Sequence, residues 1–236
     1  MLIPLTRQKF EQLIPRIATA EQYQFAAGKF PDLLRRLLIS VVGVVAVWIL
    51  KLILFGASAF SGFLFAIGAI AGLYWLWGPV LWASLRNAEY RKYQYSGFWR
   101  GRVLDVFVSE DLIGSEETVN NKGDLVIVEN RERRLNLELG DETGFTTEVQ
   151  APLKRNHQLI TPGLIAEMVV LSNRADLGTI AKVTDVYIPK HDLWVSDYPY
   201  LQRNMFTETS QRLRNGQKSQ PRRRTQKKNR PRTQQY

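Results

Sequence analysis

One stretch decides the fold of this chain: residues 37–85, which read LLISVVGVVAVWILKLILFGASAFSGFLFAIGAIAGLYWLWGPVLWASL. Its only charged residue is Lys51. One passage through a hydrocarbon core of about 30 Å takes about 20 helical residues, so the stretch exceeds one passage and fits two. Small and polar residues at 56–62 supply a turn between them. The sequence therefore predicts a transmembrane helical hairpin over 33–87, with spans near 33–55 and 63–85.

Charged and aromatic residues at the ends of the spans predict how the hairpin sits in the bilayer. The expected membrane-interface anchors are Arg35, Arg36, Lys51, Trp75, Trp77, Trp82, Arg86, Arg91 and Lys92. Lys51 lies near the far end of the first span, where its side chain can reach the headgroups. The positive-inside rule then predicts both termini on the cytoplasmic face, as in a plasma membrane, or on the stromal face in a plastid.

A stripe of small residues in the second span predicts close helix packing. Its members are Gly62, Ala66, Gly68 and Gly72, and the last two form a GxxxG pattern. Two interpretations are open, because the stripe can pack on the first span or on another membrane protein. Gly78-Pro79 predicts a kink near the end of the second span.

The N-terminal segment, residues 1–32, predicts an amphipathic helix between Thr6 and Ala20, capped by Thr6. Its apolar side chains recur at helical spacing, at Phe10, Leu13, Ile14 and Ile17. Either this helix lies at the anionic headgroups, or it packs on the protein's own soluble domain.

Residues 88–205 predict a β-rich soluble domain. Short apolar or alternating runs bounded by turn residues mark the expected strands, at 99–108, 123–129, 134–139, 145–149, 166–171, 178–188 and 192–195. Arg131-Glu132-Arg133 resembles the tip of a hairpin. This pattern is typical of a small antiparallel barrel or sandwich, so the expected class is an α+β membrane protein.

The last segment, residues 206–236, predicts a disordered basic tail. From Thr209 onward it contains ten Lys or Arg and no acid, whereas the rest of the chain has 22 of each sign. Its polyanion-binding candidates are Arg222, Arg223, Arg224, Lys227, Lys228, Arg230 and Arg232. Three roles are open: a solubilising tail, attraction to anionic lipid headgroups, and sequence-independent binding of RNA or ribosomes.

Recognisable catalytic or metal-binding patterns are lacking. The chain has no Cys and two His, which excludes thiolate sites and most zinc or triad arrangements. His191 and Asp192 suit a polar turn better than a metal or acid–base site. We therefore expect no catalytic residue, metal ligand, cofactor or small-molecule substrate, and a protein that is not an enzyme.

Transport by a single chain is disfavoured, because two spans cannot enclose a pathway and the bilayer centre would hold no ionisable group. The leading hypothesis is a non-enzymatic membrane protein that serves as an assembly, maintenance or scaffold factor for a membrane complex. The alternatives are an oligomeric transport or channel subunit, and a membrane tether for ribosomes or RNA through the tail.

The segments Thr184–Pro189 (TDVYIP) and Leu193–Pro199 (LWVSDYP), together with the Trp-rich span, carry a resemblance. Over residues 1–205 the chain resembles a small family of cyanobacterial and plastid membrane proteins with two spans followed by a soluble domain. The resemblance implies an auxiliary or assembly role at thylakoid complexes, with another membrane protein as partner.

Overall fold

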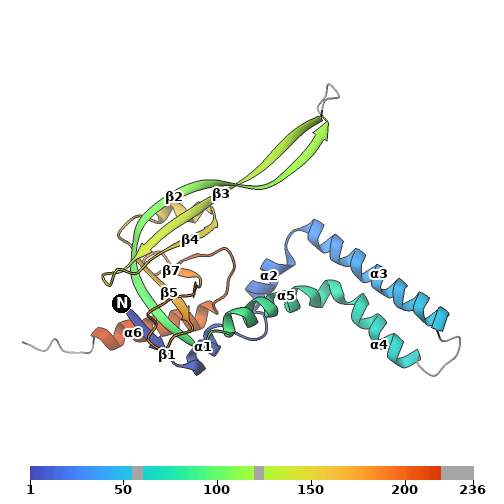
Figure 1. Cartoon of the computed structure of the whole chain (residues 1–236), viewed down its shortest axis with the longest axis horizontal. Helices are drawn as coiled ribbons and strands as arrows, with labels where there is room; N and C mark the ends of the chain where they lie inside the picture. Colours follow the sequence, from blue (N-terminus) through green and yellow to red (C-terminus); the bar gives the residue numbers. More distant parts are fainter. Residues whose placement is uncertain (55–60, 120–124, 219–236) are drawn as a thin grey trace, which may run out of the picture. The chain divides into compact units, whose positions relative to one another are not determined.

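The computed structural model describes residues 1–54, 61–119 and 125–218 (Figure 1). It is an α+β structure with one antiparallel sheet. The chain divides into two compact units, residues 1–202 and residues 203–236. All of the helices and strands described below belong to the first unit, except for the last helix.

The N-terminal segment folds into strand β1 (Leu2–Leu5) and helices α1 (Arg7–Leu13) and α2 (Ala20–Ala27). Thr6 caps α1, since its hydroxyl accepts a hydrogen bond from the Lys9 amide. The side chains of Phe10, Leu13 and Ile14 are at most 1% exposed. These three side chains are thus buried within the protein, as the second interpretation predicts. The predicted helix was too long, since α1 ends at Leu13 and Ile17 is 73% exposed.

The apolar stretch forms three helices, α3 (Phe30–Leu54), α4 (Ser61–Gly72) and α5 (Tyr74–Arg91). By length and composition, α3 is able to cross a membrane. Residues 61–91 do not form one straight span, because α4 and α5 meet at Leu73 with a bend of 72°. Pro79, at which the sequence predicts a kink, lies inside α5, six residues after this bend.

The sheet contains eight strands. After β1 these are β2 (Tyr95–Val119), β3 (Leu125–Gly140), β4 (Thr146–Pro152), β5 (Ile165–Ser172), β6 (Lys182–Val183), β7 (Val186–Ile188) and β8 (Leu193–Val195). A short 3-10 helix, η2 (Arg155–Leu159), follows β4. The strand order is β4-β3-β2-β5-β7-β8, with β1 paired to β2 and β6 to β5. Among the described strands, no pairing joins β4 to β8, so the sheet is open rather than a closed barrel.

The two longest strands merge regions that the sequence pattern separates. β2 pairs with β3 from Arg102 opposite Gly140 to Val119 opposite Leu125. Arg131-Glu132-Arg133 lies inside β3, opposite residues 110–112, and the hairpin tip predicted there is wrong. The cluster of charged residues suggested a turn. In the structure these residues lie in a strand pair whose side chains are mostly exposed, so charge is tolerated there. The sequence also places turn residues at 120–124, and these lie outside the described residues.

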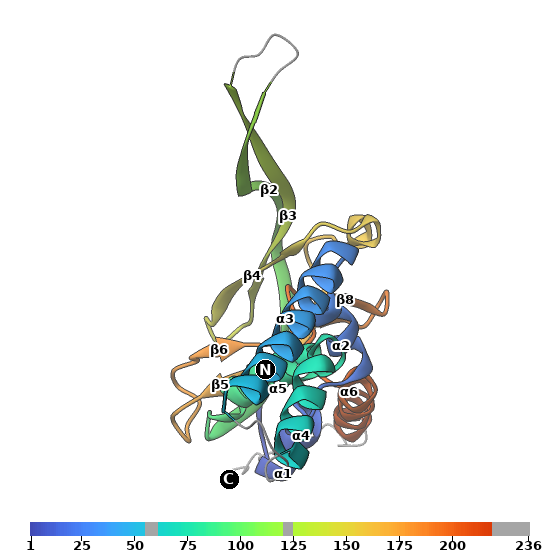
Figure 2. The ribbon, with the colours of Figure 1, turned by 90° about the vertical axis from the view of Figure 1, so that its right-hand side faces the viewer.

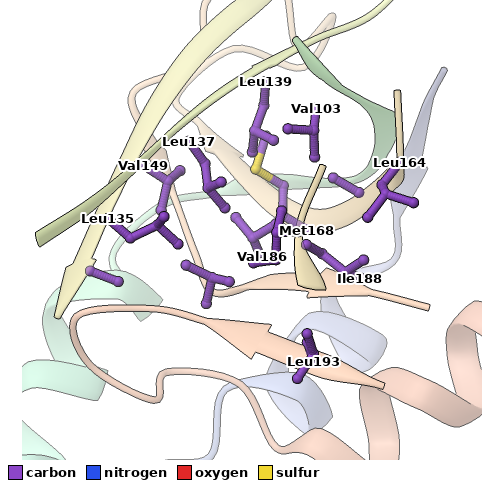
Figure 3. Close-up of a cluster of buried hydrophobic side chains, with 14 of the residues drawn as sticks. Val103, Leu135, Leu137, Leu139, Val149, Leu164, Met168, Val186, Ile188 and Leu193 are labelled. Atoms are coloured by element: carbon purple, nitrogen blue, oxygen red, sulfur yellow. The ribbon is translucent and has the colours of Figure 1, made fainter. Parts of the chain in front are cut away.

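The core fills one side of the sheet with aliphatic side chains (Figure 3). They come from β2, β3, β4, β5, β7 and β8 and include Val103, Leu135, Leu137, Leu139, Val149, Met168, Val186, Ile188 and Leu193. Alternate residues of a strand share one face, so Leu135, Leu137 and Leu139 enter this core together. This core lies along the parts of β2 and β3 that pair with β5 and β4. Both strands continue beyond the core.

Trp99 is fully buried in this core, and its indole nitrogen donates a 2.9 Å hydrogen bond to Asp141 Oδ2. Burial alone would raise the pKa of the Asp141 carboxyl. Hydrogen bonds from the side chain and backbone of Thr143 and from the N-terminal amine lower that pKa to about 2, so the acceptor is ionised at neutral pH. Gly101 leaves room for the indole, because a Cβ there would overlap both Trp99 and the carbonyl oxygen of Gly140.

Replacement of Gly101 by Ala should therefore destabilise the domain by about 1–3 kcal/mol, as expected for overpacking against backbone. Thermal unfolding of the purified protein in detergent, followed by circular dichroism, measures the loss. Gly114→Ala is the matched control, because a Cβ at Gly114 has no atom within 4 Å. Equal unfolding midpoints for the two variants would contradict the close approach of Trp99 to Gly101.

The second unit begins with α6 (Arg203–Lys218). The sequence predicted disorder for 206–236, and for residues 206–218 this was wrong. Spacing explains the helix, since Phe206, Thr209, Ser210 and Leu213 recur at intervals of three and four and share one face. Residues 219–236, with the seven polyanion-binding candidates, lie outside the described part of the chain.

Candidate membrane anchor and interaction ribbon

Helix α3 presents apolar side chains to its surroundings along most of its length. Those exposed by at least 40% include Phe30, Leu34, Leu38, Val42, Val45, Trp48, Leu52 and Ile53. Such a surface exceeds the apolar patches that soluble monomers tolerate, and it suits a lipid environment. The first site of interest is therefore the surface of α3 with the helices that pack on it.

The small-residue stripe of α4 is only partly used in packing. α3 and α4 lie side by side in both views (Figures 1 and 2). A Cβ added at Gly72 would lie 3.2 Å from Val44, and one at Gly68 would lie 3.6 Å from Val47. These two glycines thus face α3 of the same chain. Gly62 has no atom within 4 Å of an added Cβ and Ala66 is exposed, so neither belongs to this contact.

Two side chains form hydrogen bonds with backbone groups that the bend at Leu73 releases. Without the bend, the Trp75 amide and the Ile70 carbonyl would have partners within one helix. Here the Trp75 amide donates to Ser40 Oγ on α3 at 3.1 Å, and Trp77 Nε1 donates to the Ile70 carbonyl at 2.9 Å. Because unpaired backbone groups are costly in apolar surroundings, these two bonds stabilise the bend.

Loss of the Ser40 hydroxyl should loosen the bend. We expect Ser40→Ala to leave the Trp75 amide unpaired, at a cost of about 1–3 kcal/mol, and to raise hydrogen–deuterium exchange in residues 73–77. Ser40→Thr keeps the hydroxyl and is the control. Unchanged exchange in Ser40→Ala would show that another group pairs with this amide.

The chain leaves the folded unit at α3 and returns to the same place at the end of α5. Gln22 of α2 and Asn87 of α5 are fully buried and exchange two side-chain hydrogen bonds, at 3.0 and 2.8 Å. Gln22 also donates to the Pro199 carbonyl at 2.8 Å. In addition, β1 pairs with β2, Leu2 lying opposite Trp99. Segments on both sides of the apolar helices are therefore parts of one folded structure.

Residues after β8 fasten this junction. The Asp185 carboxylate accepts backbone hydrogen bonds from Tyr200 and Leu201 at 2.9 and 3.1 Å. The ring of Tyr200 stacks on Tyr90 of α5, with centroids 3.7 Å apart. Burial raises the pKa of Tyr198 to about 12 against the opposing effect of the Arg86 charge, so its phenol is neutral at physiological pH. The segment that carries the resemblance thus contacts α2 and α5, through Pro199 with Gln22 and Tyr198 with Arg86.

The buried amide pair should show strong thermodynamic coupling. A double-mutant cycle with Gln22→Ala and Asn87→Ala is expected to give an interaction free energy of about 1–3 kcal/mol in thermal unfolding. The exposed ion pair of Arg174 and Asp176, 2.8 Å apart, is the reference cycle. Its coupling should stay below about 1 kcal/mol. Additive effects of the two amide substitutions would contradict this role.

The predicted membrane-interface anchors fall into different environments. Arg35, Lys51, Trp75, Trp82, Arg86 and Lys92 are exposed. Arg36 instead donates to the carbonyls of Ala26, Ala27 and Asp32, at the end of α2 and the start of α3. Arg91 is largely buried, donates to the Ile14 carbonyl at 2.6 Å and pairs with Glu11 at 3.2 Å. These two arginines hold helix ends in place within the protein.

The second site is an extension of the sheet, here called the ribbon: residues 111–119 of β2 paired with residues 125–132 of β3. It extends past the ends of β4 and β5 (Figures 1 and 2). β5 pairs with β2 only as far as Arg102, and β4 with β3 only from Arg134. Among the described strands, none pairs with either outer edge of the ribbon. Sequence reasoning missed it, because the pattern placed a turn at 131–133.

The ribbon combines exposed apolar side chains with negative charge. Leu112, Ile113, Leu125 and Ile127 are 56–75% exposed. By sequence it contains five acidic residues against the single cation Arg131. Unpaired edges of this kind accept an added strand from another chain, and the charge favours a basic partner.

His191 and Asp192, the residues considered for a metal or acid–base site, lie in a turn. Residues 189–192 connect β7 to β8, and Asp192 has a positive φ of 51° and accepts a 2.8 Å hydrogen bond from the Tyr187 hydroxyl. Within the described residues, no group of three or more His, Asp or Glu side chains is placed to hold a metal ion.

The fold and these surfaces define an α+β protein with a helix able to cross a membrane and an open antiparallel sheet. A family model for a family of unknown function (DUF8619) matches residues 3–220, and the chain belongs to this family. No curated protein and no solved structure matches it.

Proposed function

We propose that this is a non-enzymatic membrane protein that holds a protein-binding ribbon next to one face of a bilayer, as a scaffold or assembly factor for a membrane complex. The observation that carries the proposal is the combination of the apolar surface of α3 with an acidic, partly apolar ribbon whose edges are unpaired. The first feature provides an anchor and the second a binding element.

Topology supports a hairpin in the membrane. Because β1 pairs with β2 and Gln22 bonds to Asn87, the segments before α3 and after α5 lie on the same face of any bilayer that α3 crosses. The chain must then cross an even number of times, and the return path runs through α4. The sheet and both ends of the first unit share one face, which the positive-inside rule assigns to the cytoplasm or stroma.

Ribbon edges bind partners through backbone hydrogen bonds, and side chains on the added strand provide selectivity. The exposed apolar residues Ile113 and Ile127 supply buried area in such a complex, and Glu117 offers a charge to a basic partner. Gly68 and Gly72 face α3 of the same chain, so the helix-packing stripe offers less support to an oligomeric transport or channel subunit.

Partner capture should depend on the ribbon. Residues 111–132 are replaced by Asn-Gly, which joins the paired residues Glu110 and Arg133 through a tight turn. Affinity purification from native membranes in mild detergent should lose the proteins that the full chain enriches. The thermal unfolding midpoint should be unchanged, because the ribbon lies outside the core.

Two further variants make the test specific. Ile127→Lys should weaken capture at least tenfold, whereas Leu159→Lys, at a similarly exposed site on η2, should not. Removal of residues 219–236 distinguishes the scaffold proposal from a tether for ribosomes or RNA. The tether predicts that this removal abolishes salt-sensitive co-sedimentation with ribosomes. Full capture without the ribbon would overturn the scaffold proposal.

A further inference from the structure

Helix α5 has an inner and an outer face. The inner face is buried and contains Pro79, Ala83 and Asn87, which are spaced by four residues. The outer face is apolar and exposed, with Trp75, Leu81, Trp82 and Leu85 at 37%, 41%, 57% and 52%. From Arg86 onward the exposed side chains are mostly polar. The outer face thus continues the apolar surface of α3 and α4 as far as Leu85.

The bend turns the axis of α5 away from the axes of α3 and α4. α4 packs along α3, so the two share the direction of the hairpin. If α4 follows the membrane normal, a bend of 72° leaves α5 about 18° from the membrane plane. Residues 74–85 extend about 18 Å along the axis of α5, but the depth in the bilayer changes by only about 6 Å between the two ends of this segment.

The bend also lies close to the polar boundary of the hairpin. Ser40, which bonds to the Trp75 amide, comes four residues after Arg36. This separation is about 6 Å along α3. The Arg36 guanidinium bonds to the last carbonyls of α2, a group of polar atoms that belongs outside the hydrocarbon. α5 therefore starts within a few ångströms of the level at which headgroups begin.

We propose that the steep part of the return passage ends at Leu73, and that α5 completes it at a shallow angle along the headgroup–acyl boundary, with its outer face toward lipid. This inference rests on the membrane anchoring in the proposed function. Trp75 and Trp82 suit that depth, because indoles prefer the membrane interface. The occupant of the outer face is then the bilayer surface, and the folded unit rests on it through α5.

Nitroxide depth measurements test the proposal directly. The chain contains no Cys, so one introduced Cys carries the only label. Leu73→Cys and Leu85→Cys report on α5, and Phe63→Cys and Ile70→Cys on α4; all four wild-type side chains are more than 50% exposed. The full chain is reconstituted in phosphatidylcholine vesicles. Depth follows from the competing accessibility of each label to oxygen and to a polar nickel complex.

The expected result is a depth difference of about 10 Å between positions 63 and 70, and of only about 6 Å between positions 73 and 85. A difference near 18 Å for the α5 pair would mean that α5 continues the steep crossing, and it would overturn this inference alone. Equal depths at positions 63 and 70 would overturn the inference together with the upright anchor. Spin–spin broadening at position 85 would assign the outer face to a second copy of the chain and overturn the lipid contact.

Discussion

The buried amide pair of Gln22 and Asn87 joins the two points at which the chain leaves and re-enters its folded unit. Two fully buried amides must find partners, and here each finds the other while Gln22 also bonds to the Pro199 carbonyl. The pairing of β1 with β2 closes the same junction through backbone hydrogen bonds. Because both points belong to one folded unit, the helices between them have to return to the side of any membrane from which they started.

The same requirement for hydrogen-bond partners applies at the bend between α4 and α5. A straight helix satisfies its own amides and carbonyls, whereas a bend of 72° releases some of them. Ser40 and Trp77 supply side-chain partners at the bend. The direction of α5 is thus set by contacts made within the hairpin, and this direction brings Asn87 to Gln22. The junction and the bend support each other.

The ribbon obeys a different constraint. Its strands satisfy each other along one edge, while the outer edges and the side chains of Leu112 and Ile127 gain little from the core. A long exposed strand pair with apolar side chains invites association, and its negative charge restricts which surfaces associate. The ribbon contributes little to the stability of the isolated chain, so its edges and exposed side chains are available to stabilise a complex.

Much of the architecture follows from local patterns in the sequence. The length of the apolar stretch predicts membrane helices, alternation with turn residues predicts an antiparallel sheet, and Thr6 with apolar residues at helical spacing predicts α1, because these signals depend on near neighbours. The site of the bend, the continuity of β2 and β3 through charged residues, and the buried roles of Arg36 and Arg91 depend on partners far away in the sequence. Ser40 and Trp75 are 35 residues apart, and Gln22 and Asn87 are 65 apart. The sequence by itself determined a long apolar helical stretch followed by an antiparallel sheet, and only the tertiary structure decided where that stretch bends, because hydrogen bonds between distant residues stabilise the bend.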